Sequence, residues 1–253
     1  MLSEQLMITA GKLFMGNFVL SSDYYAANTT GFMNRAVSND RAGRYFDILG
    51  LGMQARWQQE GWYASVGFAD AKAEDEFDFD SLSDGKLVWT GEFGVATGWG
   101  DQRSELALMV ASFDQTDEFR EEDSVSLAFQ HEYGTSAEHA LYGRYTWRNG
   151  GKVRPGNNAK NELPTKQGGF FGWRWNRAFS QANQQIAVAG FYGEMNETQR
   201  IAGFDRHQYG AETYWRIDWT AWASLTFDIQ LMKNLEDDWE AIPGLRLKFT
   251  WVF

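Results

Sequence analysis

Charged side chains recur at alternate positions inside the apolar segments of this sequence. Arg144 and Arg148 lie in one such segment, and Glu212 and Arg216 lie in another. An arginine presents a fork of hydrogen-bond donors and a carboxylate only accepts, so rows of both can replace water around a polar molecule. The charged residues placed in this way are Lys12, Arg56, Glu92, Arg144, Arg148, Arg174, Glu212, Arg216, Asp228 and Arg246.

Two acidic motifs could instead activate a water molecule. Asp78-Phe-Asp80 and Asp205-Arg-His207 lie outside the apolar segments, and such pairs resemble those of the omptin outer-membrane proteases. The sequence around them does not otherwise match that family. His131 and His139 flank a short connection, and the sequence has no serine in a recognisable nucleophile context. We therefore expect no enzyme, and omptin-like hydrolysis is the alternative.

The acidic stretches Glu74–Asp84 and Asp114–Asp123 are the candidate cation sites. Calcium takes oxygen ligands from carboxylates, but the glycine-punctuated spacing of an EF-hand is missing here. The whole chain has no cysteine and three histidines, so thiol chemistry and a rich metal site are excluded. We expect solvated loops, no metal and no cofactor.

The composition narrows the class of protein. The chain has 253 residues, 43% of them hydrophobic, and a net charge of -11, which argues against a nucleic-acid partner. It contains no apolar run long enough for a membrane helix. The first residues lack a basic region and an apolar stretch, so we expect no signal peptide in this chain. Twelve tryptophans, 26 glycines and three prolines favour extended strands with belts of aromatic residues.

Period-two alternation dominates the sequence and predicts twelve strands, most of them long enough to cross a bilayer when tilted. Connections that are long and short in turn join them, as in an up-and-down barrel with tight turns at one rim. The strands are predicted at Leu6–Met15, Asp47–Trp57, Trp62–Asp70, Lys86–Gly98, Glu105–Phe113, Ser124–Tyr133, Ala140–Arg148, Gly168–Arg177, Asn183–Glu194, Gln208–Asp218, Ala223–Lys233 and Gly244–Phe253.

The alternation separates an apolar face from a charged face. Trp147 and Phe227 belong to the apolar face, whereas Arg144 and Asp228 belong to the other. A large soluble sheet with one solvated face is the alternative, but it favours shorter strands. The sequence therefore predicts an all-β, antiparallel, up-and-down transmembrane β-barrel, with residues 1–253 as a single domain.

The end of the chain carries the most specific local pattern. Gly244–Phe253 alternates throughout and ends on Phe253. This pattern resembles the closing strand of bacterial outer-membrane barrels, in which the final aromatic residue is recognised by the barrel-insertion machinery. The resemblance implies that Phe253 is an insertion signal.

Three stretches resemble the carbohydrate-selective porin (OprB) family. The first runs from Ala10-Gly-Lys-Leu-Phe14 through Asp23-Tyr-Tyr-Ala-Ala-Asn28 to Gly31-Phe-Met-Asn34. The second is Gly168-Gly-Phe-Phe-Gly-Trp-Arg-Trp-Asn176. The third joins Ala211–Ile217, Leu225–Asn234 and Ile242–Leu247. Family barrels have about 16 strands. Because their in-folded loop follows about the fifth strand, this chain is either a fragment or a shortened barrel.

The resemblance implies passive, selective diffusion of carbohydrates across the bacterial outer membrane. It implies that residues 16–46 fold inward as a constriction loop, with Asn34 and Arg35 near the narrowest point. The charged residues named above would then line the pore. The expected partners are outer-membrane lipid, sugar solutes and the insertion machinery, and homo-oligomer formation stays open. The alternative to transport is a degenerate or structural barrel.

Overall fold

The computed structural model describes residues 5–20, 22, 24, 31–38, 49–71, 84–99, 102–114, 121–150, 165–195, 206–233 and 238–250. Their dominant element is one antiparallel sheet of twelve strands, in which each strand pairs with its neighbours in the chain. Among these residues, no helix has the length and apolarity needed to cross a membrane. The predicted all-β, up-and-down architecture is confirmed.

The strands lie close to the predicted positions, and β3 and β11 have the predicted bounds. A short 3-10 helix η1 (Met15–Asn17) and a helix α1 (Arg35–Ser38) follow β1, and a 3-10 helix η4 (Ala178–Ser180) precedes β9. The strands are β1 (Leu6–Phe14), β2 (Leu49–Gln59), β3 (Trp62–Asp70), β4 (Leu87–Trp99), β5 (Gln102–Phe113), β6 (Glu122–Tyr133), β7 (His139–Gly150), β8 (Thr165–Trp175), β9 (Gln184–Met195), β10 (His207–Thr220), β11 (Ala223–Lys233) and β12 (Trp239–Phe249).

The start of the last strand was predicted wrongly. β12 begins at Trp239 and runs through Pro243, whereas the alternation pattern placed its start at Gly244. Proline cannot donate a hydrogen bond to a neighbouring strand and is tolerated in edge strands. In the described sheet β12 is such an edge, since its ladder there is with β11. Phe253, the predicted insertion signal, lies outside the described residues.

The two ends of the sheet differ in the lengths of their connections. Residues 60–61, 100–101, 134–138, 176–183 and 221–222 join strands at one end, which we call the short-turn end. Gly61 and Gly134 have positive φ angles of 84° and 85° there, as tight turns require. Each connection at the opposite end, the long-connection end, is longer than the short turns on either side of it. Short turns are typical of the periplasmic rim of outer-membrane barrels.

The sheet has an apolar outer face and an inner face that carries most of the charges. Trp147 and Phe227 are 46% and 43% exposed on the outer face, as the alternation predicted. Aromatic rings form pairs on this face at both ends, which is typical of interfacial girdles. Pairs at the short-turn end include Trp57–Trp62, Trp175–Phe179 and Trp222–Phe249, and pairs at the other end include Phe68–Trp89, Tyr145–Trp147 and Tyr209–Trp239.

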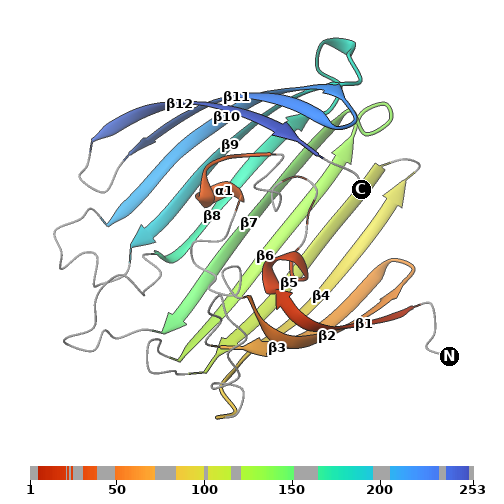
Figure 1. Ribbon diagram of the computed structural model, residues 1–253, viewed down its shortest axis with the longest axis vertical. Helices are drawn as coiled ribbons and strands as arrows, with labels where there is room; N and C mark the ends of the chain where they lie inside the picture. Colours follow the sequence, from red (N-terminus) through yellow and green to blue (C-terminus); the bar gives the residue numbers. More distant parts are fainter. Residues whose placement is uncertain are drawn as a thin grey trace.

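The strands curve so that the sheet forms a trough with α1 on its concave side (Figure 1). Among the described residues, β1 pairs with β2 alone and β12 with β11 alone. Residues 15–20, 22, 24 and 31–38, which we call the inner segment, pack against the inner face of the sheet. Their buried side chains Met15, Leu20 and Phe32 join inner-wall residues such as Met109 and Tyr142 in one apolar cluster. The core of the described molecule is therefore the contact between the inner segment and the inner wall.

Candidate constriction site

Glu92 on β4 anchors the first part of the inner segment. Its Oε2 atom accepts a hydrogen bond of 3.0 Å from the backbone N–H of Leu20. Its Oε1 atom accepts one of 2.6 Å from the Tyr63 hydroxyl. The Gln54 side chain on β2 also donates to the carbonyl oxygen of Phe18 at 2.9 Å. Two wall strands, β2 and β4, therefore hold residues 18–20 in place, and Tyr63 on β3 holds Glu92.

Glu212 on β10 anchors the second part. It accepts the backbone N–H groups of Met33 and Asn34 at 2.6 and 3.0 Å, and the residue is only 1% exposed. Asn34 Oδ1 accepts the N–H of Ala36 at 2.9 Å, so Asn34 caps the first turn of α1. Its Nδ2 atom donates to Gln230 on β11 at 3.1 Å. Asn34 thus connects α1 to two wall strands.

Arg246 extends this anchoring to β12, because its guanidinium donates to the carbonyl oxygen of Gly31. The same guanidinium lies within electrostatic range of the Glu212 and Asp228 carboxyl groups. Glu212 and Asp228 interact with each other on paired strands, so two carboxyl groups share the wall beneath residues 31–34. The cation of Arg246 interacts favourably with both groups.

An aromatic cluster lies between the two anchors. Tyr24 stacks on Tyr142 with ring centroids 5.4 Å apart, and the Arg174 guanidinium lies 4.0 Å from the Tyr24 ring. Phe32 meets Tyr214 edge to face at 4.9 Å. The Tyr24 hydroxyl donates to Glu132. Burial of the phenol raises the Tyr24 pKa above its usual value, and this hydrogen bond raises it further. The phenol is therefore a neutral donor.

Two glycines on the inner face make room for lumen tyrosines. A Cβ atom at Gly94 would lie 2.2 Å from the Tyr63 ring, and one at Gly172 would lie 2.5 Å from the Tyr142 ring. Any side chain at these positions would displace the ring beside it. The glycines of β4 and β8 thus position Tyr63 and Tyr142 against the inner segment.

The predicted site residues divide by burial. Arg56, Arg174, Arg216 and Arg246 are half-buried on the inner face, with Arg56 3.8 Å from the Tyr63 ring and Arg216 bound to Asp218 at 2.7 Å. The sequence did not predict that others are buried: Asn34 of the inner segment, and Glu92, Arg144, Arg148, Glu212 and Asp228 on the inner face. For Arg35, only its position as the first residue of α1 is described.

Arg144, Arg148 and Arg174 do not form one solvent-facing basic surface, since Arg144 and Arg148 are buried. Arg148 pairs with Glu122 at 3.2 Å, and both side chains are buried. Arg144 lies 5.4 Å from the Phe170 ring. Arg174 lies nearer the short-turn end, since it pairs with Ala140.

The placement of Lys12 on the inner face was wrong. It pairs with Leu51, whereas its neighbours Gly11 and Leu13 pair with Gly52 and Gly50 on the inner face. Lys12 therefore faces outward. Apolar residues occupy both faces of Leu6–Phe14, so alternation alone did not fix the phase of this strand.

The alternative catalytic motifs lie mainly outside the described residues, including Asp78, Asp80 and Asp205. His207 bonds to the Tyr192 hydroxyl at 2.8 Å on the outer face. A Ser104–His131 hydrogen bond of 2.7 Å, which the sequence did not reveal, is also on the outer face. The described ranges hold no group of three metal-ligating side chains, and most of the two acidic stretches lies beyond them.

Comparison with known proteins shows likeness in fold. No protein-family model matches the chain, and no curated protein matches it. OprB from Pseudomonas putida has a TM-score of 0.76 at 13% identity, over 97% of this chain and 69% of that one. OccK2 (OpdF) from Pseudomonas aeruginosa has a TM-score of 0.53 at 12% identity, over 78% of this chain and 55% of that one.

A BenF-like porin from Pseudomonas fluorescens Pf-5 has a TM-score of 0.51 at 11% identity, over 79% of this chain and 53% of that one. The solved structures that the chain resembles are therefore channels rather than enzymes. The chain has the antiparallel up-and-down β-barrel fold of OprB-like outer-membrane porins.

Proposed function

We propose that this protein is a porin of the bacterial outer membrane through which carbohydrates diffuse passively. The observation that carries the proposal is the inner segment, which packs across the inner wall from β2 to β12 and brings Tyr24 beside Arg174. Such a segment narrows a barrel lumen. A narrow passage selects solutes by the groups that line it.

The chemistry around Tyr24 suits a sugar. The Tyr24 and Tyr142 rings are buried and stack on each other, so a sugar would meet this cluster at Arg174, which lies over the Tyr24 ring. The half-buried Arg174 offers forked donors for hydroxyl groups, and its Nε atom also donates to Asn176 at 2.5 Å. A neutral solute rich in hydroxyl groups can replace water at these donors.

The remaining features follow from the same proposal. The apolar outer face would contact outer-membrane lipid, and Phe253 would serve the barrel-insertion machinery. Residues 16–46 would form the constriction loop, with Asn34 and Arg35 close to the passage. No cofactor is needed for diffusion.

Liposome swelling tests transport directly. Proteoliposomes in isotonic glucose or maltose should swell faster than empty liposomes. Arg174→Ala should lower the sugar-driven rate several-fold, because donors are lost beside Tyr24. Arg177→Ala is the matched control, since Arg177 is exposed in the turn after β8. Swelling no faster than in empty liposomes would contradict the proposal.

A barrel without transport is the second candidate. It is favoured by the burial of the inner wall, where Glu92 is 4% exposed and Asp228 is 2% exposed. If the inner segment blocks the lumen completely, purified protein will insert into bilayers and show no ion conductance. Steady conductance steps in a planar bilayer would exclude this candidate.

A further inference from the structure

A groove of about 680 Å³ crosses the outer face of the sheet from β6 to β12. It opens on the side of the sheet opposite the inner segment, where the outward side chains Phe171, Tyr192, Tyr209 and Leu231 line it. Its lining also includes Arg144, Phe170 and Phe191, whose buried side chains belong to the inner face. Its volume falls within the range of about 300–1,000 Å³ that is typical of ligand pockets.

Small residues on three adjacent strands form the floor of the groove. Gly190 on β9 pairs with Ala211 on β10, and Gly169 on β8 pairs with Tyr192, two residues further along β9. A Cβ atom at Gly190 would meet nothing nearer than the Gly210 carbonyl oxygen at 3.8 Å. The large side chains of Phe171 and Leu231 flank the small residues Gly190 and Ala211, and this difference in size forms a depression in the outer face.

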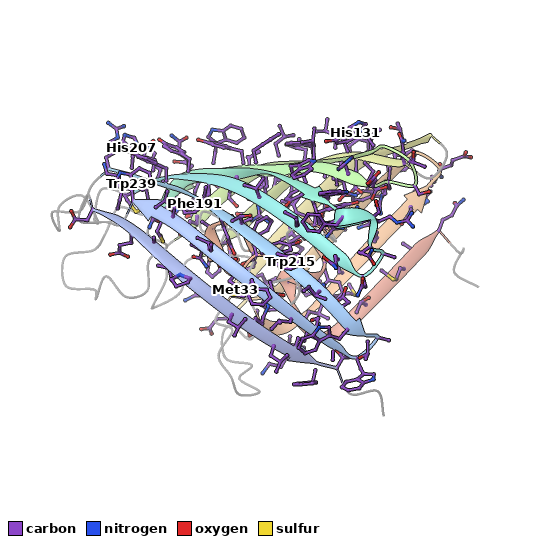
Figure 2. The ribbon with its side chains drawn as sticks, turned by 90° about the horizontal axis from the view of Figure 1, so that it is seen from above. Met33, His131, Phe191, His207, Trp215 and Trp239 are labelled. Atoms are coloured by element: carbon purple, nitrogen blue, oxygen red, sulfur yellow. The ribbon has the colours of Figure 1, made fainter. Side chains whose placement is uncertain are left out.

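The groove has a cationic end. Lys233 Nζ lies 5.4 Å from the Tyr209 ring, and Tyr209 meets Trp239 edge to face at 5.5 Å. His207 bonds to the Tyr192 hydroxyl at 2.8 Å. Lys233, His207 and Trp239 all lie at the long-connection end of their strands, where Figure 2 shows His207 and Trp239 together, away from His131. The apolar groove therefore leads to the ammonium group of Lys233 in a chain whose net charge is -11.

We propose that the groove binds an acyl chain of a phosphorylated lipid of the outer leaflet, with the phosphate near Lys233. An acyl chain can fill a long apolar groove in a lipid-facing wall. If the groove stayed unfilled, the residues of its floor would lose van der Waals contacts. A phosphate complements the ammonium group of Lys233 at the membrane surface. The inference rests on the proposed outer-membrane location but not on sugar transport.

Native mass spectrometry of the detergent-solubilised protein, titrated with lipid A or with phosphatidylethanolamine, tests the proposal. The wild type should retain lipid A more tightly than phosphatidylethanolamine. Gly190→Leu should weaken lipid A binding at least ten-fold, because a leucine fills the floor. Gly91→Leu is the matched control, since Gly91 also faces outward, between Val66 and Val110 on the neighbouring strands and away from the groove.

Lys233→Gln should reduce the preference for lipid A and leave phosphatidylethanolamine binding unchanged. Ala211→Leu replaces Gly190→Leu if the glycine variant fails to show the heat-modifiable band of a folded barrel.

Lipid A binding equal to wild type in the floor variants would overturn the proposal. Equal affinity for both lipids would overturn it too. If a floor variant changes from an oligomer to a monomer in the mass spectrum but still binds lipid A, the groove binds a second copy of the chain and the proposal is wrong. Liposome swelling is measured separately, so failure here is distinct from failure of transport.

Discussion

Removing the Glu212 carboxylate should free residues 31–34 from the wall. Glu212→Ala deletes the acceptor for the N–H groups of Met33 and Asn34, which it holds at 2.6 and 3.0 Å. Glu212 is 1% exposed, so little water reaches these groups to replace it. Each buried N–H left without an acceptor costs about 1–3 kcal/mol.

The two lost hydrogen bonds together amount to roughly 2–6 kcal/mol of anchoring. Since about 1.4 kcal/mol is a factor of ten, even the lower value raises the detached population about thirty-fold. When residues 31–34 are detached and mobile, the open cross-section of the channel beside them is no longer fixed. We therefore expect a larger mean conductance and more current noise in single-channel recordings.

Glu122→Ala is the matched control for this experiment. It also removes a buried carboxylate from the inner wall, but one that binds Arg148 at 3.2 Å instead of the inner segment. The reasoning is refuted if the single-channel conductance and noise of Glu212→Ala equal those of the wild type. It is also refuted if Glu122→Ala changes them by the same amount.

Four further variants test the two faces. Arg148→Ala leaves Glu122 buried without its cation and should destabilise the barrel by about 3–5 kcal/mol in urea unfolding, whereas Arg148→Met with Glu122→Leu should restore most of that loss. Phe227→Arg puts a charge on the lipid face, where it costs up to about 2–4 kcal/mol, and should reduce the heat-modifiable folded band on gels. Arg174→Ala removes a half-buried lumen cation, so the reversal potential in a salt gradient should shift toward cation selectivity; an unchanged potential would place Arg174 away from the ion path.

The sequence was sufficient to predict the strands and most of their faces, because side-chain direction alternates with a period of two. Lys12 shows where this fails: β1 has apolar residues on both faces, so its phase depends on pairing with β2. Pro243 shows a second failure, because an edge strand tolerates a residue that usually marks an interruption.

The burial of the inner wall could not be predicted from alternation. The alternation pattern of a polar face is the same whether water or another part of the chain covers that face. Glu92 and Glu212 were correctly placed on the inner face, but their partners are backbone N–H groups of residues 20, 33 and 34, which leave no pattern in side-chain types. Tyr24 and Glu132 were missed for the same reason, since their contact depends on the path of the inner segment.

The anchors of the inner segment have a consequence for the order of assembly. The Leu20–Glu92 contact spans 72 positions of the chain, and the Met33–Glu212 contact spans 179. Contacts between positions so far apart form late, because the intervening chain must first be ordered. The second anchor cannot form until β10 has joined the sheet. A growing barrel should therefore pass through a stage in which residues 18–20 are already held against the wall while residues 31–34 are still detached, and the passage beside Glu212 should narrow only after β10 has joined.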